Sequence, residues 1–428
     1  MPPSWTTRPS PLTQRPTARR PRGSLRSIFE GLLCLAIAVI LFRSFQLEGY
    51  MISTGSMAPC LLGYHKRVVC PNCHYQYAFG TAYDESLAAG GHASGHARPA
   101  TELDLISVCP NCGQGSIDVG DVPRNQGDQL LVHKNAYALR PPRRWEVVVF
   151  RNPYRPTEAY VKRVVGLPGD ALQIIEGDIY VNGRIERKDL DAQRSIRINV
   201  YDHDYQPEHD PQWRPRWTVD AADRGASWRT IDGGFAFYGA RDADAQPAWV
   251  RYEHWLRYGG RHRTSVSLGE RSPIPPVSDS VLYPAELDRR SRELSCRGAL
   301  TTGWLDRVCL AARDPDFARA AAILHEQSHR APILDAYGYN RAFPGIEHVP
   351  VRDVMLAMTL DLSGGNGEFL VELNDGRHRV QCVIDAGRSE VRLHVDGGSE
   401  PVRTAAISSD ALTRPLRLEF SLMDRRAL

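Results

Sequence analysis

Two short motifs in the sequence combine residue types that can carry out acyl transfer together. The first is Ile52-Ser-Thr-Gly-Ser-Met-Ala-Pro59, in which Ser56 follows a glycine at a predicted turn. The second is Tyr160 to Asp170, in which Lys162 lies among valines in a predicted strand. If that lysine is buried, desolvation favours its neutral amine, which can act as a base near neutral pH. A serine hydroxyl activated by such an amine is the Ser/Lys form of nucleophilic catalysis, although a lone serine of this kind is most often only a surface hydroxyl.

Two identical Cys-Pro-Asn-Cys tetrapeptides, 35 residues apart, indicate a metal site. They contain Cys70, Cys73, Cys109 and Cys112. Two CxxC turns can offer four thiolates to one tetrahedral zinc ion, which predicts a structural zinc. The alternative is a pair of disulfides, since the region is expected to lie in an oxidising compartment. Disulfides within CxxC motifs are strained and easily reduced, which favours zinc.

The elements that must position these residues belong to more than one domain. A chain of 428 residues exceeds the ~100–150 residues of a common domain. Its 42% hydrophobic and 24% charged residues are typical of a globular protein. The 53 basic and 50 acidic residues nearly balance, so nothing favours a nucleic-acid partner.

The N-terminal region predicts a membrane anchor. Residues 1–26 contain six arginines and no acid, which indicates a basic, disordered cytoplasmic tail. Residues 27–47 are predicted to span the bilayer, with Glu30 and Arg43 reaching toward the head groups to complete the ~20 residues required. A cleaved secretion signal is the alternative, but no small-x-small cleavage pattern follows Phe42. The expected topology is a single pass in the inner, cytoplasmic membrane, with the catalytic region extracytoplasmic.

The rest of the chain is predicted to be mainly β. Residues 48–69 and 116–187 should form a β core, interrupted by a zinc-ribbon insertion at 70–115. Residues 188–428 predict a β-sandwich-like region with a short helix near 314–328, loosely similar to concanavalin-like jelly rolls, and with no ligand evident from the sequence. Tryptophan-rich strands before that helix are expected to complete the sandwich, which we expect to be incomplete at its C-terminus.

Three boxes resemble bacterial signal peptidase I, the leader peptidase of the S26 family with a Ser/Lys dyad. The family has a Ser-Gly-Ser-Met-x-Pro box just after its anchor, and this chain has TGSMAP at 54–59. The family's Gly-Asp box and Lys-Arg-Val-Val-Gly-Leu-Pro-Gly-Asp box correspond to GDQLLVHKNAY at 127–137 and KRVVGLPGD at 162–170. The chain is similar to an atypical member with an inserted zinc ribbon and a large additional β-rich region.

The resemblance implies a membrane-bound serine endopeptidase that removes signal peptides from exported preproteins after small residues at positions −1 and −3. Ser56 would attack the scissile carbonyl, and Lys162 would take its proton and later protonate the leaving amine. The backbone N–H of Ser56 and the hydroxyl of Thr54 would hold the oxyanion. No cofactor is implied for catalysis, and the partners would be signal peptides and the lipid bilayer. Residues of the boxes expected to support the site without reacting are Met57, Asp128, Arg163 and Asp170.

One further box of the family, Gly-Asp-Asn-x-x-x-Ser-x-Asp-Ser-Arg, is not found in this sequence. In the family it pairs with the arginine next to the lysine, so Arg163 is expected to be a half-buried, unpaired charge, which is costly. Either a C-terminal portion carrying the box is missing from this chain, or the chain is a degenerate member. The alternative function is therefore a catalytically impaired, membrane-anchored scaffold or binding protein. A self-cleaving repressor is a third possibility, disfavoured by the membrane segment.

Overall fold

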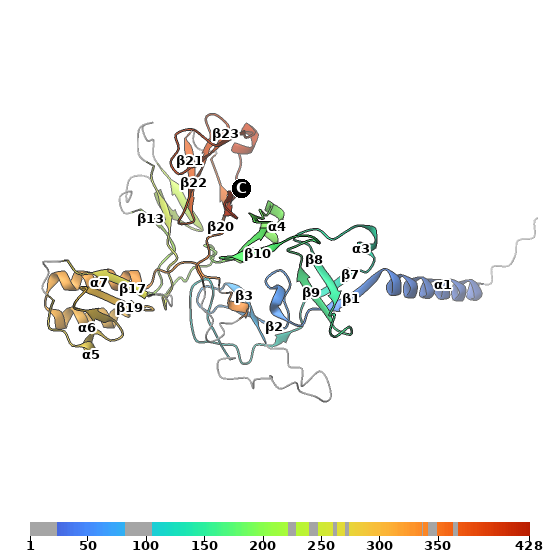
Figure 1. Ribbon diagram of the computed structural model, residues 1–428, viewed down its shortest axis with the longest axis horizontal. Helices are drawn as coiled ribbons and strands as arrows, with labels where there is room; N and C mark the ends of the chain where they lie inside the picture. The colour runs from blue at the N-terminus through green and yellow to red at the C-terminus, as the bar shows by residue number, and fades with distance from the viewer. Residues whose placement is uncertain are drawn as a thin grey trace, which may run out of the picture. The chain divides into compact units, whose positions relative to one another are not determined.

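The computed structural model describes residues 24–81, 105–220, 228–238, 247–259, 263–269, 274–335, 337–340, 349–362 and 367–428. Nearly all of the predicted N-terminal tail, and about two thirds of the stretch between the two CxxC motifs, lie outside these residues. The described chain is mainly β, with one long helix near its N-terminus, as the sequence predicts (Figure 1). It divides into a smaller unit, 24–50 with 130–141, and a larger unit, 51–129 with 142–428.

The smaller unit consists of one helix and a two-stranded ribbon. Helix α1 (Ser24–Phe45) contains a stretch of 21 residues with mean hydropathy 2.2, long and apolar enough to cross a membrane by length and composition. Strand β1 (Leu47–Met51) pairs with β7 (Gln129–His133), and the short helix α3 (Ala136–Leu139) follows.

The first part of the larger unit contains the serine and cysteine motifs. Ser56 lies in a 3-10 turn, η1 (Gly55–Met57). The remaining elements are β2 (His65–Val69), β3 (Gln76–Gly80), β4 (Ile106–Ser107), β5 (Ile117–Asp118) and β6 (Arg124–Asn125). Strands β3, β2 and β6 form one antiparallel sheet, and β4 pairs with β5. Their core surrounds the four cysteines of the CxxC motifs.

The lysine motif lies in a series of antiparallel hairpins. These comprise β8 (Val147–Arg151), β9 (Ala159–Arg163), β10 (Leu172–Ile175), β11 (Asp178–Val181) and β12 (Arg184–Ile185), followed by helix α4 (Leu190–Ile196). Asn182 and Gly183 form the turn that joins β11 to β12, with φ values of 52° and 79°. Positive φ at both central residues is what a tight two-residue hairpin turn requires.

A helical subdomain follows the tryptophan-rich strands. Those strands are β13 (Trp217–Val219), β14 (Trp228–Ile231), β15 (Gly234–Phe237) and β16 (Val250–Tyr252). They pair only with one another among the described strands, so none of them extends either sheet of the later strands. The subdomain comprises β17 (Arg263–Ser267), α5 (Asp279–Leu282), β18 (Glu286–Asp288), β19 (Glu293–Arg297), α6 (Thr302–Ala312) and α7 (Pro315–Ser328).

Helix α7 confirms the predicted helix, and its local sequence explains where it begins. Asp314 caps it by accepting a hydrogen bond from Phe317 N at 2.8 Å, and Pro315 occupies its first turn. Helix α6 was not predicted. It lies beside α7, which packs on β17 and β19 (Figure 1), and a continuous hydrophobic core joins these elements.

Two antiparallel sheets form the last part of the chain, after a short 3-10 turn, η4 (Gly338–Asn340). One sheet has the order β20-β25-β26 and the other β21-β22-β23-β24, and both contribute to one hydrophobic core. Their bounds are β20 (Val354–Leu360), β21 (Glu368–Asn374), β22 (Arg379–Asp385), β23 (Glu390–Val395), β24 (Arg403–Ala406), α8 (Ser409–Leu412), β25 (Leu416–Met423) and β26 (Arg426–Ala427). This part of the chain is rich in strands, as the sequence predicts.

Candidate active site and cysteine cluster

The serine and lysine motifs meet in the larger unit. Lys162 Nζ donates a hydrogen bond to Ser56 Oγ at 2.8 Å, across 106 positions of sequence. Lys162 also donates to its neighbour's carbonyl, Val161 O, at 3.0 Å. Strand β9 packs against the turn η1, which brings the two side chains together. This geometry is suited to transfer of a proton from hydroxyl to amine once the lysine is neutral.

The turn that carries Ser56 is held by the Gly-Asp box. Ile52 N donates to Asp128 O at 2.9 Å, and Asp128 N donates to Leu62 O at 2.8 Å. The Asp128 carboxylate accepts from Leu62 N at 2.7 Å. A side chain at Gly127 would place its Cβ 1.8 Å from Ile52 O, so only glycine permits this approach. The box therefore fixes both chain segments that flank the serine.

Thr54 precedes the turn and is fixed through its backbone. A Cβ at Gly63 would lie 2.6 Å from Thr54 C, so the two backbones are in close contact. Thr54 occupies the capping position of η1 with extended φ and ψ, and its side chain makes no capping hydrogen bond there. Its exposed hydroxyl thus lies one residue from the Gly55–Met57 turn, and half-buried Met57 ends that turn.

Lys162 is exposed, which differs from the burial that its valine neighbours suggest. Successive side chains of a strand point to opposite faces, so Val161 and Arg163 lie on the face away from the lysine. Tyr160 shares its face, with the ring centroid 5.7 Å from Lys162 Nζ. The desolvation expected for the amine is therefore not provided by the described residues around it.

Asp170 closes the lysine motif. Its carboxylate accepts from Leu167 N at 2.7 Å and pairs with Arg144 Nη2 at 2.9 Å. These contacts hold the turn after β9, and they direct the carboxylate to backbone and arginine groups.

Arg163 is not left without partners, so that expectation is wrong. Its guanidinium donates to Trp145 O at 2.8 Å, to Ser195 Oγ at 3.1 Å and to Ser195 O at 3.2 Å. None of the ion pairs found among the described residues involves Arg163. Neutral oxygens from two elements therefore satisfy the charge, without an acidic box. Sequence reasoning missed Trp145 and Ser195, because neither belongs to a recognisable motif.

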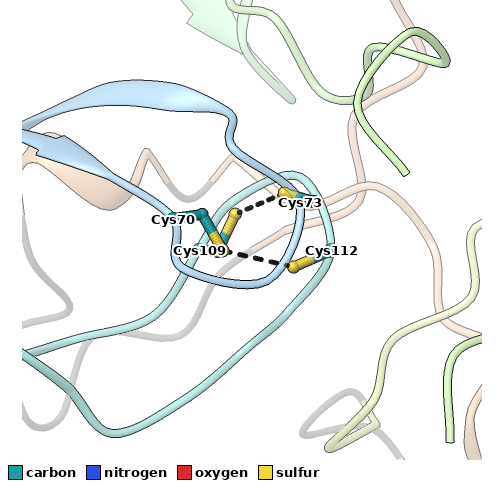
Figure 2. Close-up of side chains that lie close together, drawn as sticks. All are labelled: Cys70, Cys73, Cys109 and Cys112. Carbon is teal, nitrogen blue, oxygen red and sulfur yellow. Dashed lines mark hydrogen bonds between the residues drawn. The ribbon is translucent and has the colours of Figure 1, made fainter. Parts of the chain in front are cut away.

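The four cysteines of the CxxC motifs converge in a buried cluster (Figure 2). Their sulfur atoms all lie within 4.8 Å of one another, and each side chain is at most 2% exposed. Cys70 Sγ is 3.6 Å from Cys112 Sγ, and Cys73 Sγ is 3.7 Å from Cys109 Sγ. Tetrahedral zinc with bonds of ~2.3 Å requires sulfur separations of ~3.8 Å. All nine cysteines lie in described parts of the chain, and no disulfide joins them.

The protonation chemistry of the cluster fits the same interpretation. Hydrogen bonding from Cys109 lowers the pKa of the Cys70 and Cys73 thiols, whereas the neighbouring sulfurs raise the pKa of Cys109 and Cys112. The thiolate is the form of cysteine that binds metal. Four cysteine sulfurs this close together are compatible with a metal site.

The asparagine shared by both CPNC motifs has a role that the sequence did not suggest. Asn72 Nδ2 donates to Asp210 Oδ2 at 2.7 Å. Asn111 Nδ2 donates to Tyr205 O at 2.7 Å and to Asp202 O at 3.1 Å, and its Oδ1 accepts from Asp202 N at 2.7 Å. Each motif thus binds the 202–210 loop. The sequence signal that could have indicated this role is the asparagine repeated at the third position of both motifs.

The lysine motif lies inside a stretch shared with known proteins. Residues 123–223 match the family described as signal peptidase, peptidase S26. The chain is similar to the signal peptidase S26 family over this stretch. It is 42% identical over 67 residues to a probable signal peptidase I-2 of Synechocystis sp., covering 14% of this chain and 29% of the relative. The signal peptidase I of Pseudomonas aeruginosa is 42% identical over 77 residues, or 15% of this chain and 27% of that protein. A third relative, signal peptidase I of Leptolyngbya laminosa, is 40% identical over 65 residues, with shares of 13% and 32%.

The matched region is similar to proteins described as signal peptidases. The chain spans less than a third of the length of each of these three relatives. No solved structure matches the chain. The sequence shared with the S26 family includes Lys162, whereas Ser56 precedes the matched residues.

Proposed function

We propose that this protein is a membrane-bound signal peptidase in which Ser56 is the nucleophile and Lys162 the general base. The observation that carries the proposal is the 2.8 Å contact between Lys162 Nζ and Ser56 Oγ. Both side chains are exposed, so their contact contributes little to the stability of the fold. A hydroxyl and an amine in hydrogen-bond contact, both accessible to a peptide, are the requirement of a Ser/Lys peptidase.

The reaction follows from the atoms in contact. Neutral Lys162 takes the proton of the Ser56 hydroxyl while its oxygen attacks the scissile carbonyl carbon. The oxyanion accepts hydrogen bonds from Ser56 N and the Thr54 hydroxyl. The Lys162 ammonium then gives its proton to the leaving amine, and the C–N bond breaks. A water molecule hydrolyses the acyl-enzyme by the same proton transfers and restores the serine.

The bound substrate supplies the burial that Lys162 lacks in the chain alone. A signal peptide lying over Ser56 and Tyr160 would exclude water from the amine and favour its neutral form. Small residues at −1 and −3 of the substrate would allow the peptide backbone to approach the shallow surface at the turn η1.

Helix α1 is proposed as the anchor in the inner membrane, with its N-terminus in the cytoplasm. Its apolar side chains are exposed, among them Leu32 at 60%, Leu35 at 60% and Ile40 at 62%. An exposed apolar helix of this length is unfavourable in water and is satisfied by lipid. The arginine-rich residues before it favour the cytoplasmic side.

The cysteine cluster is proposed to hold one structural zinc ion, so that residues 70–115 form a zinc ribbon. The support is the set of four buried sulfurs at tetrahedral spacing. The ion would fix the two CPNC turns and, through Asn72 and Asn111, the 202–210 loop. Catalysis itself needs no cofactor.

The test is cleavage of an exported preprotein by the full chain produced in membranes. Wild type, Ser56→Ala and Lys162→Met are compared for release of the mature protein. We expect product from the wild type alone. Equal product from all three would show that another peptidase is responsible, and the proposed dyad would be discarded.

A further inference from the structure

Arg163, the residue after the proposed base, is held by two separate routes that lead to the same strand, β25. We propose that Ser195 is a positioning residue for Lys162 and acts through Arg163, and that the turn after β25 supports Arg163 by the second route. The inference rests on the proposed function. It concerns how this chain supports strand β9, which carries Lys162, when no carboxylate among the described residues binds Arg163.

The first route runs through the end of helix α4. Ser195 Oγ accepts from Arg163 Nη1 at 3.1 Å and donates to Ala192 O at 2.7 Å. Ser195 O, one of the last carbonyls of the helix, accepts from Arg163 Nη2 at 3.2 Å. Carbonyls in the last turn have no partner within the helix and carry partial negative charge, so they suit a guanidinium.

Helix α4 is in turn fixed to β25. Ser421 Oγ donates to Gln193 Oε1 at 2.7 Å, and both side chains are fully buried. The carboxylate of Glu419 pairs with Arg194 at 2.6 Å and with Arg197 at 3.2 Å. Glu419 and Ser421 are two positions apart in the strand, so they lie on the same face. The helix that carries Ser195 therefore cannot move without breaking buried contacts to β25.

The second route runs through Trp145. Its carbonyl accepts from Arg163 at 2.8 Å, and its N–H donates to Val164 O at 2.7 Å. The ammonium of Lys188 lies 5.2 Å from the centroid of the Trp145 ring. Lys188 also pairs with Asp424, in the turn after β25, and the side chains are 9% and 1% exposed. Its backbone N donates to the same carboxylate at 3.0 Å.

Both routes fix one side of strand β9. Arg163 points to the face opposite Lys162, and β9 pairs with β8 in the register Val148 to Lys162. Fixing the arginine therefore limits rotation of the strand about its axis, and that rotation would carry the amine away from Ser56 Oγ. Displacements of about 1 Å can cost ~100-fold in rate.

The test measures kcat and KM of the full chain on a preprotein. Ser195→Ala should lower kcat by up to about tenfold, the effect of one lost hydrogen bond, with KM unchanged. Ser195→Thr keeps the hydroxyl and should restore the rate. In an Arg163→Met background, Ser195→Ala should have no further effect, because Ser195 acts only through that arginine.

The second route is tested with Asp424→Asn, which should lower kcat by about 10- to 100-fold. The matched control is Asp210→Asn, since Asp210 is also buried and paired, with Arg257. We expect the control to keep the wild-type kcat. Thermal unfolding of each variant separates loss of the fold from loss of positioning. If Asp424→Asn does not fold, Ser195→Ala still tests the support of Arg163, because Ser195 is exposed and its substitution should not prevent folding.

The outcomes distinguish the two proposals. A wild-type kcat in Ser195→Ala, or an equal loss in the Arg163→Met background, would overturn this inference and leave the dyad intact. Absence of cleavage by the wild type, or cleavage by Ser56→Ala, would overturn the proposed function and this inference with it.

Discussion

The cysteine cluster and the Ser/Lys pair are assembled in the same way but exposed differently. Each joins two motifs that are far apart: Cys109 lies 36 positions after Cys73, and Lys162 lies 106 positions after Ser56. The four cysteines are at most 2% exposed, whereas Ser56 and Lys162 are both exposed. The first has the features of a closed structural site, and the second those of a site open to a substrate.

Because of this difference in exposure, substitutions at the two sites should affect different properties. Groups buried in a core contribute to stability, and their loss is measured in unfolding. Groups exposed at a reactive site contribute little to stability, so their loss is measured in rate.

The largest effect is expected at the dyad. Ser56→Ala and Lys162→Met should each lower cleavage by about 10³-fold or more, as loss of a nucleophile or its base does. Their melting temperatures should stay within about 2 °C of the wild type, since both side chains are exposed. Cys60→Ala, four residues from the nucleophile, is the control and should keep full activity. Melting temperatures that fall together with activity would mean that the dyad is a structural contact.

Loss of a cysteine ligand is expected to affect stability most. Cys73→Ser should reduce bound zinc from about one per chain to none and destabilise the ribbon by several kcal/mol. Metal analysis of purified protein and thermal unfolding, with and without chelator, measure both. Cys296→Ala, a buried cysteine outside the cluster, should keep the metal. If the purified wild type contained no metal and its four cysteines were oxidised, the zinc proposal would be rejected in favour of disulfides.

Removal of the CPNC asparagines should have a smaller effect. Asn111→Ala removes three hydrogen bonds at a buried side chain, 2% exposed, and should cost about 2–3 kcal/mol. Asn72→Ala removes the bond to Asp210 and should cost about 1 kcal/mol. Zinc content should be unchanged in both. If either variant lost the metal, the asparagines would belong to the metal site rather than to the docking of the loop.

The smallest effect is expected at Asp353 and depends on pH. Burial raises its pKa from 3.8 to about 6, and the carboxyls of Asp178 and Asp424 and the ammonium of Lys188 face it. The folded state therefore binds more protons than the unfolded state between these values, and stability is lost as pH rises through about 6.

Asp353→Asn cannot ionise and keeps an acceptor for Asp424 N. It should be more stable than the wild type at pH 7–8, by about 1–2 kcal/mol after discounting for partial exposure, and no more stable near pH 4. Thermal unfolding across this pH range measures the difference. A stability gap that does not change with pH would contradict the raised pKa.

The sequence alone determined the elements with strong local signals. Helix α7 begins at its Asp-Pro pair, the hairpin turns at Asn182-Gly183, and the late strands follow alternating apolar residues. The sequence also identified the serine, lysine and CxxC motifs, because each is a contiguous run of residues. The resemblance to signal peptidases also rests on such runs.

Only the tertiary structure decided which distant groups meet. Arg163 binds Trp145 and Ser195, and no local pattern marks either partner. Lys162 is exposed although valines surround it in sequence, because strand neighbours point to opposite faces. The pairing of β25 with β20 and its contacts with α4 depend on long-range packing, which residue spacing does not encode.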